Sequence, residues 1–149
     1  MWYRRALLAA LLVVLAGCGQ PPADFTDVNG EGYRYADFQD KWIIVNYWAT
    51  WCAPCIKEIP ELNKLATDHA ADLVVLGVNF DDPQGEEQLK QVRKMKIEFP
   101  VYSAPPHEGL GITPPEVLPT TFVFAPGLEL KATLVGPQTE ETLLAAMAP

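Results

Sequence analysis

The 149-residue chain has few of the side chains that hold metals or bind nucleic acids. It contains three cysteines and two histidines, and its 19 Asp and Glu outnumber its 11 Lys and Arg, for a net charge of −8. Such acidity argues against nucleic acid and against electrostatic attraction to anionic lipid. A structural zinc site needs four ligands, and neither His69 nor His107 has a finger spacing, so we expect no metal and no cofactor.

The chain also lacks a hydrophobic run long enough for a comfortable membrane span. Its N-terminal apolar run, residues 6–17, follows Arg4 and Arg5 and has the pattern of a signal peptide. Residues 1–17 are therefore predicted to direct export and to lie outside the fold. An uncleaved anchor helix is the alternative.

The chemistry of the chain centres on Cys52 and Cys55. Residues 42–48 form an apolar run typical of a buried strand, and from residue 53 to about 69 the apolar residues recur at helical spacing. Cys52 thus lies where a helix begins, and the unpaired N–H groups there stabilise a thiolate, so we expect Cys52 to be the nucleophile. Cys55 is expected to resolve the mixed disulfide, and Pro54 favours the helix start.

The sequence around these cysteines carries a family resemblance. Trp51 and Pro54 belong to a WCAPC motif, which follows the strand sequence IIVNYWAT and precedes KEIPEL; Leu-Pro-Thr occurs later, at 118–120. Over about residues 25–147 the chain resembles the thioredoxin superfamily, specifically its extracytoplasmic thiol-disulfide reductases of the TlpA/ResA type, which include cytochrome c maturation thioredoxins. A zinc half-site or a structural disulfide are the alternatives for the two cysteines.

The resemblance implies a thioredoxin fold, an α/β three-layer sandwich with a mixed central sheet and an N-terminal β-hairpin, in one monomeric domain at 25–149. Five prolines and two glycines at 103–119 are expected to exclude a regular element there. The other expected elements are a hairpin around Asn29-Gly30, a strand at 73–79, a helix at 86–96, an extended segment at 99–102, a hairpin of 121–125 and 128–135, and a helix at 138–147.

The Leu118-Pro119-Thr120 segment resembles the cis-proline turn of the superfamily, which lies opposite the CxxC motif. The resemblance implies a cis bond before Pro119, with Thr120 supporting the site. Proline adopts the cis form at little cost. The ring would keep a backbone N–H away from Cys52, and the adjoining main chain could pair with an extended client segment. A trans proline that ends a loop is the alternative.

Proton transfer needs a carboxylate, and Asn46 occupies the position where thioredoxin itself has a buried aspartate. The resemblance therefore implies another carboxylate. Glu58, one helical turn beyond Cys55, is the leading candidate, with a solvated helix glutamate as the alternative. Asp82 is the second candidate, and a turn or capping role is its alternative. His107 is also considered as a base, although a histidine in a surface loop is usually inert.

The third cysteine, Cys18, ends a Leu-Ala-Gly-Cys sequence at 15–18. This sequence resembles the lipobox of bacterial lipoproteins, in which the cysteine is lipid-modified and becomes the first residue. The resemblance implies a tether at 18–24, a membrane anchor and a periplasmic domain. Gly19 favours the outer membrane where the host has one. A third redox cysteine is the alternative.

These features together predict a lipid-anchored extracytoplasmic thiol-disulfide oxidoreductase. It is expected to reduce disulfides of client proteins and to receive electrons from an upstream dithiol donor. A peroxiredoxin-like thiol peroxidase is one alternative, but of the proline and threonine that precede the cysteine in that family only Thr50 stands nearby. A redox-inert binding module on the same scaffold is the other.

Overall fold

The computed structural model describes residues 21–148. The predicted signal peptide and Cys18 lie outside the described residues. Hydrogen bonds with the domain already begin at Asp24, whose N–H donates to the Tyr33 carbonyl (2.8 Å) and whose carboxylate accepts the Tyr35 N–H (2.8 Å). Within the described part of the chain, no helix is sufficiently long and apolar to span a bilayer.

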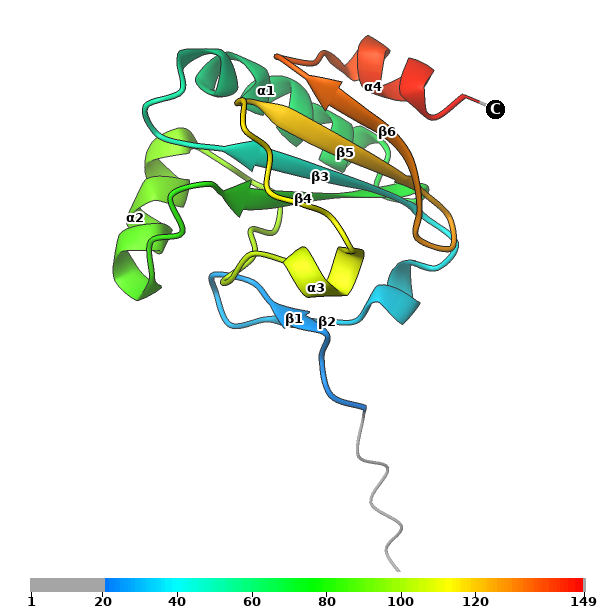
Figure 1. The fold of residues 1–149 in the computed structure, drawn as a ribbon, viewed down its shortest axis with the longest axis horizontal. Helices are drawn as coiled ribbons and strands as arrows, with labels where there is room; N and C mark the ends of the chain where they lie inside the picture. The colour runs from blue at the N-terminus through cyan, green and yellow to red at the C-terminus, as the bar shows by residue number, and fades with distance from the viewer. Residues whose placement is uncertain (1–20, 149) are drawn as a thin grey trace, which may run out of the picture.

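The centre of the fold is a four-stranded mixed sheet (Figure 1). Its strands are β3 (Trp42–Trp48), β4 (Leu73–Asn79), β5 (Thr120–Ala125) and β6 (Glu129–Val135). They lie in the order β4-β3-β5-β6, with β3 parallel to β4 and antiparallel to β5. A parallel pair needs a crossover, and a helix supplies it between β3 and β4. The expected mixed sheet is confirmed.

Helices cover one face of this sheet, and a mixed layer covers the other (Figure 1). The helices of both layers are α1 (Ala53–Asp68), α2 (Gly85–Met95), α3 (His107–Leu110) and α4 (Glu140–Ala146), with a short 3-10 helix η1 (Tyr35–Phe38). α1 and α4 pack on one face. The opposite layer contains η1, α3 and the hairpin of β1 (Phe25–Thr26) and β2 (Gly32–Tyr33). This is the predicted thioredoxin fold, hairpin included.

The prediction of no regular element at 103–119 is wrong, because α3 forms one helical turn there. The Leu110 N–H donates to the Pro106 carbonyl (3.2 Å), and Gly111 ends the turn in the left-handed region (φ 62°). Proline just before a helix costs no hydrogen bond, and glycine adopts a positive φ without strain. Proline and glycine therefore frame this element instead of excluding it.

The core consists of two clusters, one on each face of the sheet. Alternate residues of β3 divide between them, since successive side chains of a strand point to opposite faces. Ile44 and Trp48 pack toward α1, whereas Val45 and Tyr47 pack toward the hairpin layer. Gly77 on β4 lets the Trp48 side chain pack closely against the β4 backbone, because a Cβ at position 77 would lie 3.0 Å from the Trp48 indole nitrogen.

Candidate active site

Cys52 and Cys55 form a disulfide at the start of α1, with their Cα atoms 5.2 Å apart. Cys52 is the N-cap residue of α1, and its sulfur accepts the Cys55 N–H (3.2 Å). Pro54 lies in the first turn, where its missing N–H costs nothing. Cys52 is 4% exposed and Cys55 is fully buried. The geometry thus directs one N–H of the first helical turn at the sulfur of the more accessible cysteine, where it would stabilise a thiolate.

Glu58 lies one turn further along α1 and is 1% exposed, so the alternative of a solvated glutamate is wrong. Asn46, on β3, donates its Nδ2 to Glu58 Oε1 (2.6 Å) and to Thr121 Oγ1 (3.0 Å). The Gln138 N–H donates to Glu58 Oε2 (2.9 Å). Burial raises the pKa of Glu58 from 4.5 to about 7, and the hydrogen bonds from Gln138 and Asn46 oppose that rise. The carboxylate can therefore exchange a proton near neutral pH.

The raised pKa of Glu58 also links folding to pH. Between pH 4.5 and about 7 the folded protein holds this proton while the unfolded chain has released it. Stability contributed by the protonated group is therefore present below pH 4.5 and is lost as the pH rises through about 7. The shift corresponds to roughly 3 kcal/mol.

The loop after β4 contacts the CxxC turn through Asp81. The Trp51 indole nitrogen donates to the Asp81 carboxylate (2.9 Å), and the Trp51 ring packs edge-on against Phe80. Asp82, the residue predicted from the sequence, is exposed and adopts a left-handed turn (φ 46°), where its carboxylate accepts the Gln84 amide. The structure therefore places Asp82 in a turn and brings its neighbour Asp81 to the site.

Pro119 lies beside the end of β3 that leads to Cys52, because Tyr47 of β3 pairs with Thr120 of β5. The Leu118-Pro119 bond is cis, as the resemblance implies. Thr120 is buried, and its hydroxyl donates to the Val117 carbonyl (2.8 Å). The turn before β5 is thus fixed by a side chain that belongs to the predicted motif.

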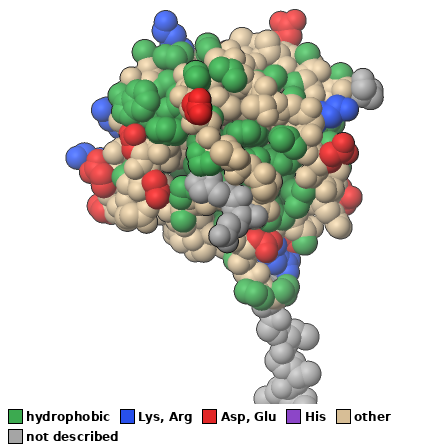
Figure 2. Space-filling model, viewed as in Figure 1, with side chains coloured by type: hydrophobic (Ala, Val, Ile, Leu, Met, Phe, Trp, Pro, Cys, Tyr) green, Lys and Arg blue, Asp and Glu red, His purple; other side chains and the backbone are tan. Residues whose placement is uncertain are grey.

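Apolar side chains surround the dithiol on the surface. Trp51 is 64% exposed, and Ile56, Phe80 and Val117 are also exposed. Figure 2 shows apolar side chains gathered at the upper left of the molecule, over the region where α1 begins in Figure 1. Such a surface suits contact with another protein.

The two histidines lie on different elements of the fold. His69 ends α1 and contacts Glu140 at the start of α4 (3.2 Å). His107 begins α3, in the layer across the sheet. Among the side chains that the structure describes, no group of three or more His, Cys, Asp or Glu could hold a metal ion.

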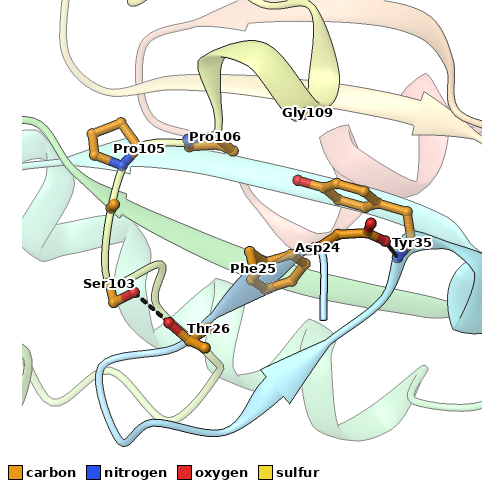
Figure 3. Close-up of a pocket in the computed structure, with 9 residues that line it drawn as sticks. Asp24, Phe25, Thr26, Tyr35, Ser103, Pro105, Pro106 and Gly109 are labelled. Atoms are coloured by element: carbon orange, nitrogen blue, oxygen red, sulfur yellow. Dashed lines mark hydrogen bonds between the residues drawn. The ribbon is translucent and has the colours of Figure 1, made fainter. Parts of the chain in front are cut away.

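A cavity of about 510 Å³ lies between the hairpin layer and the segment before α3 (Figure 3). Phe25, Tyr35 and Pro106 line it, and a hydrogen bond between Thr26 and Ser103 (2.7 Å) closes one end. None of the residues that line this cavity belongs to the CxxC turn. We therefore assign it no role in disulfide chemistry.

Comparison with known proteins agrees with this geometry. Residues 17–133 match the AhpC/TSA family. The chain belongs to the AhpC/TSA family. Within this family it is similar to the thiol-disulfide oxidoreductase ResA of Geobacillus kaustophilus, with 30% identity over 131 residues, covering 87% of this chain and 75% of that protein. ResA of Bacillus subtilis is 28% identical over 142 residues, covering 93% and 77% of the two chains.

The fold of this chain is also similar to those of solved structures. A DsbF homologue from Corynebacterium diphtheriae has a TM-score of 0.70 and 26% identity over 82% of this chain and 80% of its own. An exposed lipoprotein thioredoxin from Streptococcus pneumoniae has a TM-score of 0.66 and 25% identity over 81% and 93%. These similarities, with the dithiol at the start of α1, show that the enzyme is a ResA-like thiol-disulfide oxidoreductase.

The sequence does not single out three residues that the structure brings to the site. Thr121 and Gln138 contact the Asn46–Glu58 pair, and Asp81 contacts Trp51. Thr121 follows the Leu-Pro-Thr motif directly, so its place in the sequence indicates that it lies near the site. Gln138 contributes a backbone N–H, which every residue except proline has, so no residue type indicates it.

Proposed function

We propose that this oxidoreductase reduces disulfides of partner proteins on the extracytoplasmic side of a membrane. The observation that carries the proposal is the buried Glu58 carboxylate, which lies on the same helix as Cys52 and Cys55 and has a pKa of about 7. A general base works best when its pKa lies near the operating pH. Glu58 is thereby suited to take the proton of the resolving thiol.

The reaction begins in the reduced protein with the Cys52 thiolate. It attacks one sulfur of a client disulfide, whose S–S bond breaks as a Cys52–client bond forms and the other client sulfur leaves as a thiolate. Cys55 then gives its proton to Glu58, and its thiolate attacks the Cys52 sulfur. The Cys52–Cys55 disulfide forms, the second client thiol leaves, and two electrons have moved to the client. An upstream dithiol restores the reduced protein by the same exchange.

The proposal is tested by offering the reduced protein two different oxidants. We expect rapid oxidation by a disulfide-bonded protein, followed as loss of free thiol, and reaction with hydrogen peroxide no faster than that of a free thiol at the same pH. A rate with peroxide far above the rate with the disulfide would make the chain a thiol peroxidase. No reaction with either would leave a redox-inert binding module.

A lipid anchor at Cys18 is the second part of the proposal. It is supported by the Leu-Ala-Gly-Cys sequence and by the similarity to an exposed lipoprotein thioredoxin. Hydrogen bonds to the domain begin at Asp24, so a tether from the lipidated cysteine would be six residues long. At about 3.3 Å per residue it would hold the domain within roughly 20 Å of the bilayer.

Substitution of this cysteine should release the protein from membranes. We expect Cys18→Ala to move nearly all of the protein from the membrane fraction to the soluble extracytoplasmic fraction, measured by fractionation and immunoblotting. Cys55→Ala, which removes a thiol from the domain, serves as the matched control and should stay membrane-bound. A cleaved Cys18→Ala protein that remains on membranes would show that another surface or a partner holds it.

A further inference from the structure

Glu58 is held from two sides by elements far apart in the chain. Asn46 of β3 bonds Oε1, whereas the main-chain N–H of Gln138, in the segment between β6 and α4, bonds Oε2. The two bonds measure 2.6 Å and 2.9 Å. The carboxylate therefore has a hydrogen-bond donor on each oxygen, as a buried ionised group requires.

The segment that carries this N–H is fixed on both sides of Gln138. Gly136 has a φ of 91°, and its N–H donates to the Pro119 carbonyl (2.9 Å). The Gln138 side-chain amide folds back onto the Gly136 carbonyl (2.9 Å). Beyond it, Thr139 caps α4 through reciprocal bonds with Thr142. The Gln138 N–H is thus aimed at Glu58 by its own side chain and by both flanking turns.

The two hydrogen bonds to the Glu58 carboxylate come from uncharged groups. Asn46 and Gln138 both donate to it, and no charged side chain contributes to the shift of its pKa. Glu61, one turn further along α1, is engaged by the Glu140 N–H. The two cysteines do not titrate while they form a disulfide. The ionised form of Glu58 therefore depends on two hydrogen bonds, one of which comes from the main chain.

We propose that Gln138 is a positioning residue: its N–H, oriented by its side-chain bond to Gly136, keeps the Glu58 carboxylate able to accept the Cys55 proton. The inference rests on the proposed function for the proton transfer itself. Its physical basis is that an N–H donor stabilises the charged carboxylate more than the neutral acid. Without this donor a larger fraction of Glu58 is protonated at neutral pH and fewer molecules can accept the Cys55 proton.

The oxidised wild-type protein provides the first test, because no disulfide exchange is needed. We expect the amide proton of Gln138 to shift with pH in NMR spectra and to share one midpoint, near pH 7, with the 13C signal of the Glu58 carboxyl. The Gly136 amide, which bonds a carbonyl, is the internal control and should shift much less. Glu58→Gln should abolish the Gln138 titration. A Gln138 amide that does not follow Glu58 would overturn the proposal.

Two substitutions of Gln138 separate the N–H from the side chain. Gln138→Pro removes the donor and should raise the Glu58 midpoint by about one pH unit. Gln138→Ala keeps the donor and should give a smaller rise. The midpoint for resolution of the mixed disulfide should move by the same amount. A folded Gln138→Pro protein with an unchanged Glu58 midpoint contradicts the inference, and if this variant does not fold, the wild-type titration decides alone. If the Glu58 midpoint moves in a Gln138 variant but resolution of the mixed disulfide does not, the contact between Gln138 and Glu58 is supported. The proposed role of Glu58 as the proton acceptor is then contradicted.

Discussion

Replacing Cys52 with serine should abolish disulfide exchange, whereas replacing Cys55 should trap the client. Cys52 caps α1 and is the more accessible of the two cysteines, so we expect it to make the first attack. Serine at 55 cannot resolve the mixed disulfide, which then accumulates through Cys52. We expect Cys52→Ser to lower the rate of client reduction to the uncatalysed level. Cys55→Ser should yield a covalent complex with close to one client per protein, measured by mass spectrometry under non-reducing conditions.

The double variant Cys52→Ser/Cys55→Ser is the matched control and should form no complex. The soluble protein for this experiment should lack Cys18, because an unmodified third thiol could itself form a disulfide with the client. Trapping through Cys55 in Cys52→Ser, with none in Cys55→Ser, would invert the two roles. It would show that the N-terminal position on α1 does not select the attacking sulfur.

Replacing Glu58 with glutamine should slow the resolving step by about a hundredfold, the low end of what a positioned proton acceptor contributes. The wild-type rate of resolution should rise with pH through about 7, as Glu58 becomes ionised, and then level off. Glutamine keeps the size of the side chain and removes the base. The Glu58→Gln rate should therefore continue to rise toward the thiol pKa. Stopped-flow reduction of a model disulfide across pH measures both profiles.

The first attack by Cys52 should change little in Glu58→Gln, which separates this result from a general loss of structure. Asp82→Asn and His107→Ala are the controls, and both should keep the wild-type profile. A wild-type profile for Glu58→Gln contradicts the proposed base. If Asp82→Asn alone flattens the profile, the proton leaves through the loop after β4.

The strands were predictable because their sequences are unambiguous. Residues 42–48 and 73–79 are apolar runs bounded by charged or turn residues, and β3 and β4 have the same limits. The sequence did not predict the four-residue α3, because residues 103–119 contain five prolines and two glycines, one of them inside the helix. The number of prolines and glycines in a segment does not show where they lie, whereas a helical turn tolerates proline at its start and glycine just after its end. The order of prolines and glycines therefore matters more than their number.

The site was predictable where chemistry requires a particular side chain. Cysteine, the proline at 119 and a carboxylate one turn from Cys55 each have few substitutes. Asp81 and Asp82 are adjacent and chemically identical, so only the path of the chain after β4 distinguishes them. The contact from Gln138 depends on tertiary structure that joins residues 80 positions apart. No local pattern encodes it.

The equilibrium reduction potential of the Cys52–Cys55 pair tests the proposed reductase most directly. It is measured by equilibrating the domain with a series of glutathione ratios and quantifying the disulfide by alkylation and mass spectrometry. A reductase of client disulfides requires a potential below about −180 mV, which is near that of protein disulfide isomerase, so that electrons flow to the client. We predict a value below this limit. A value near about −120 mV, in the range of dedicated oxidants, would contradict the account.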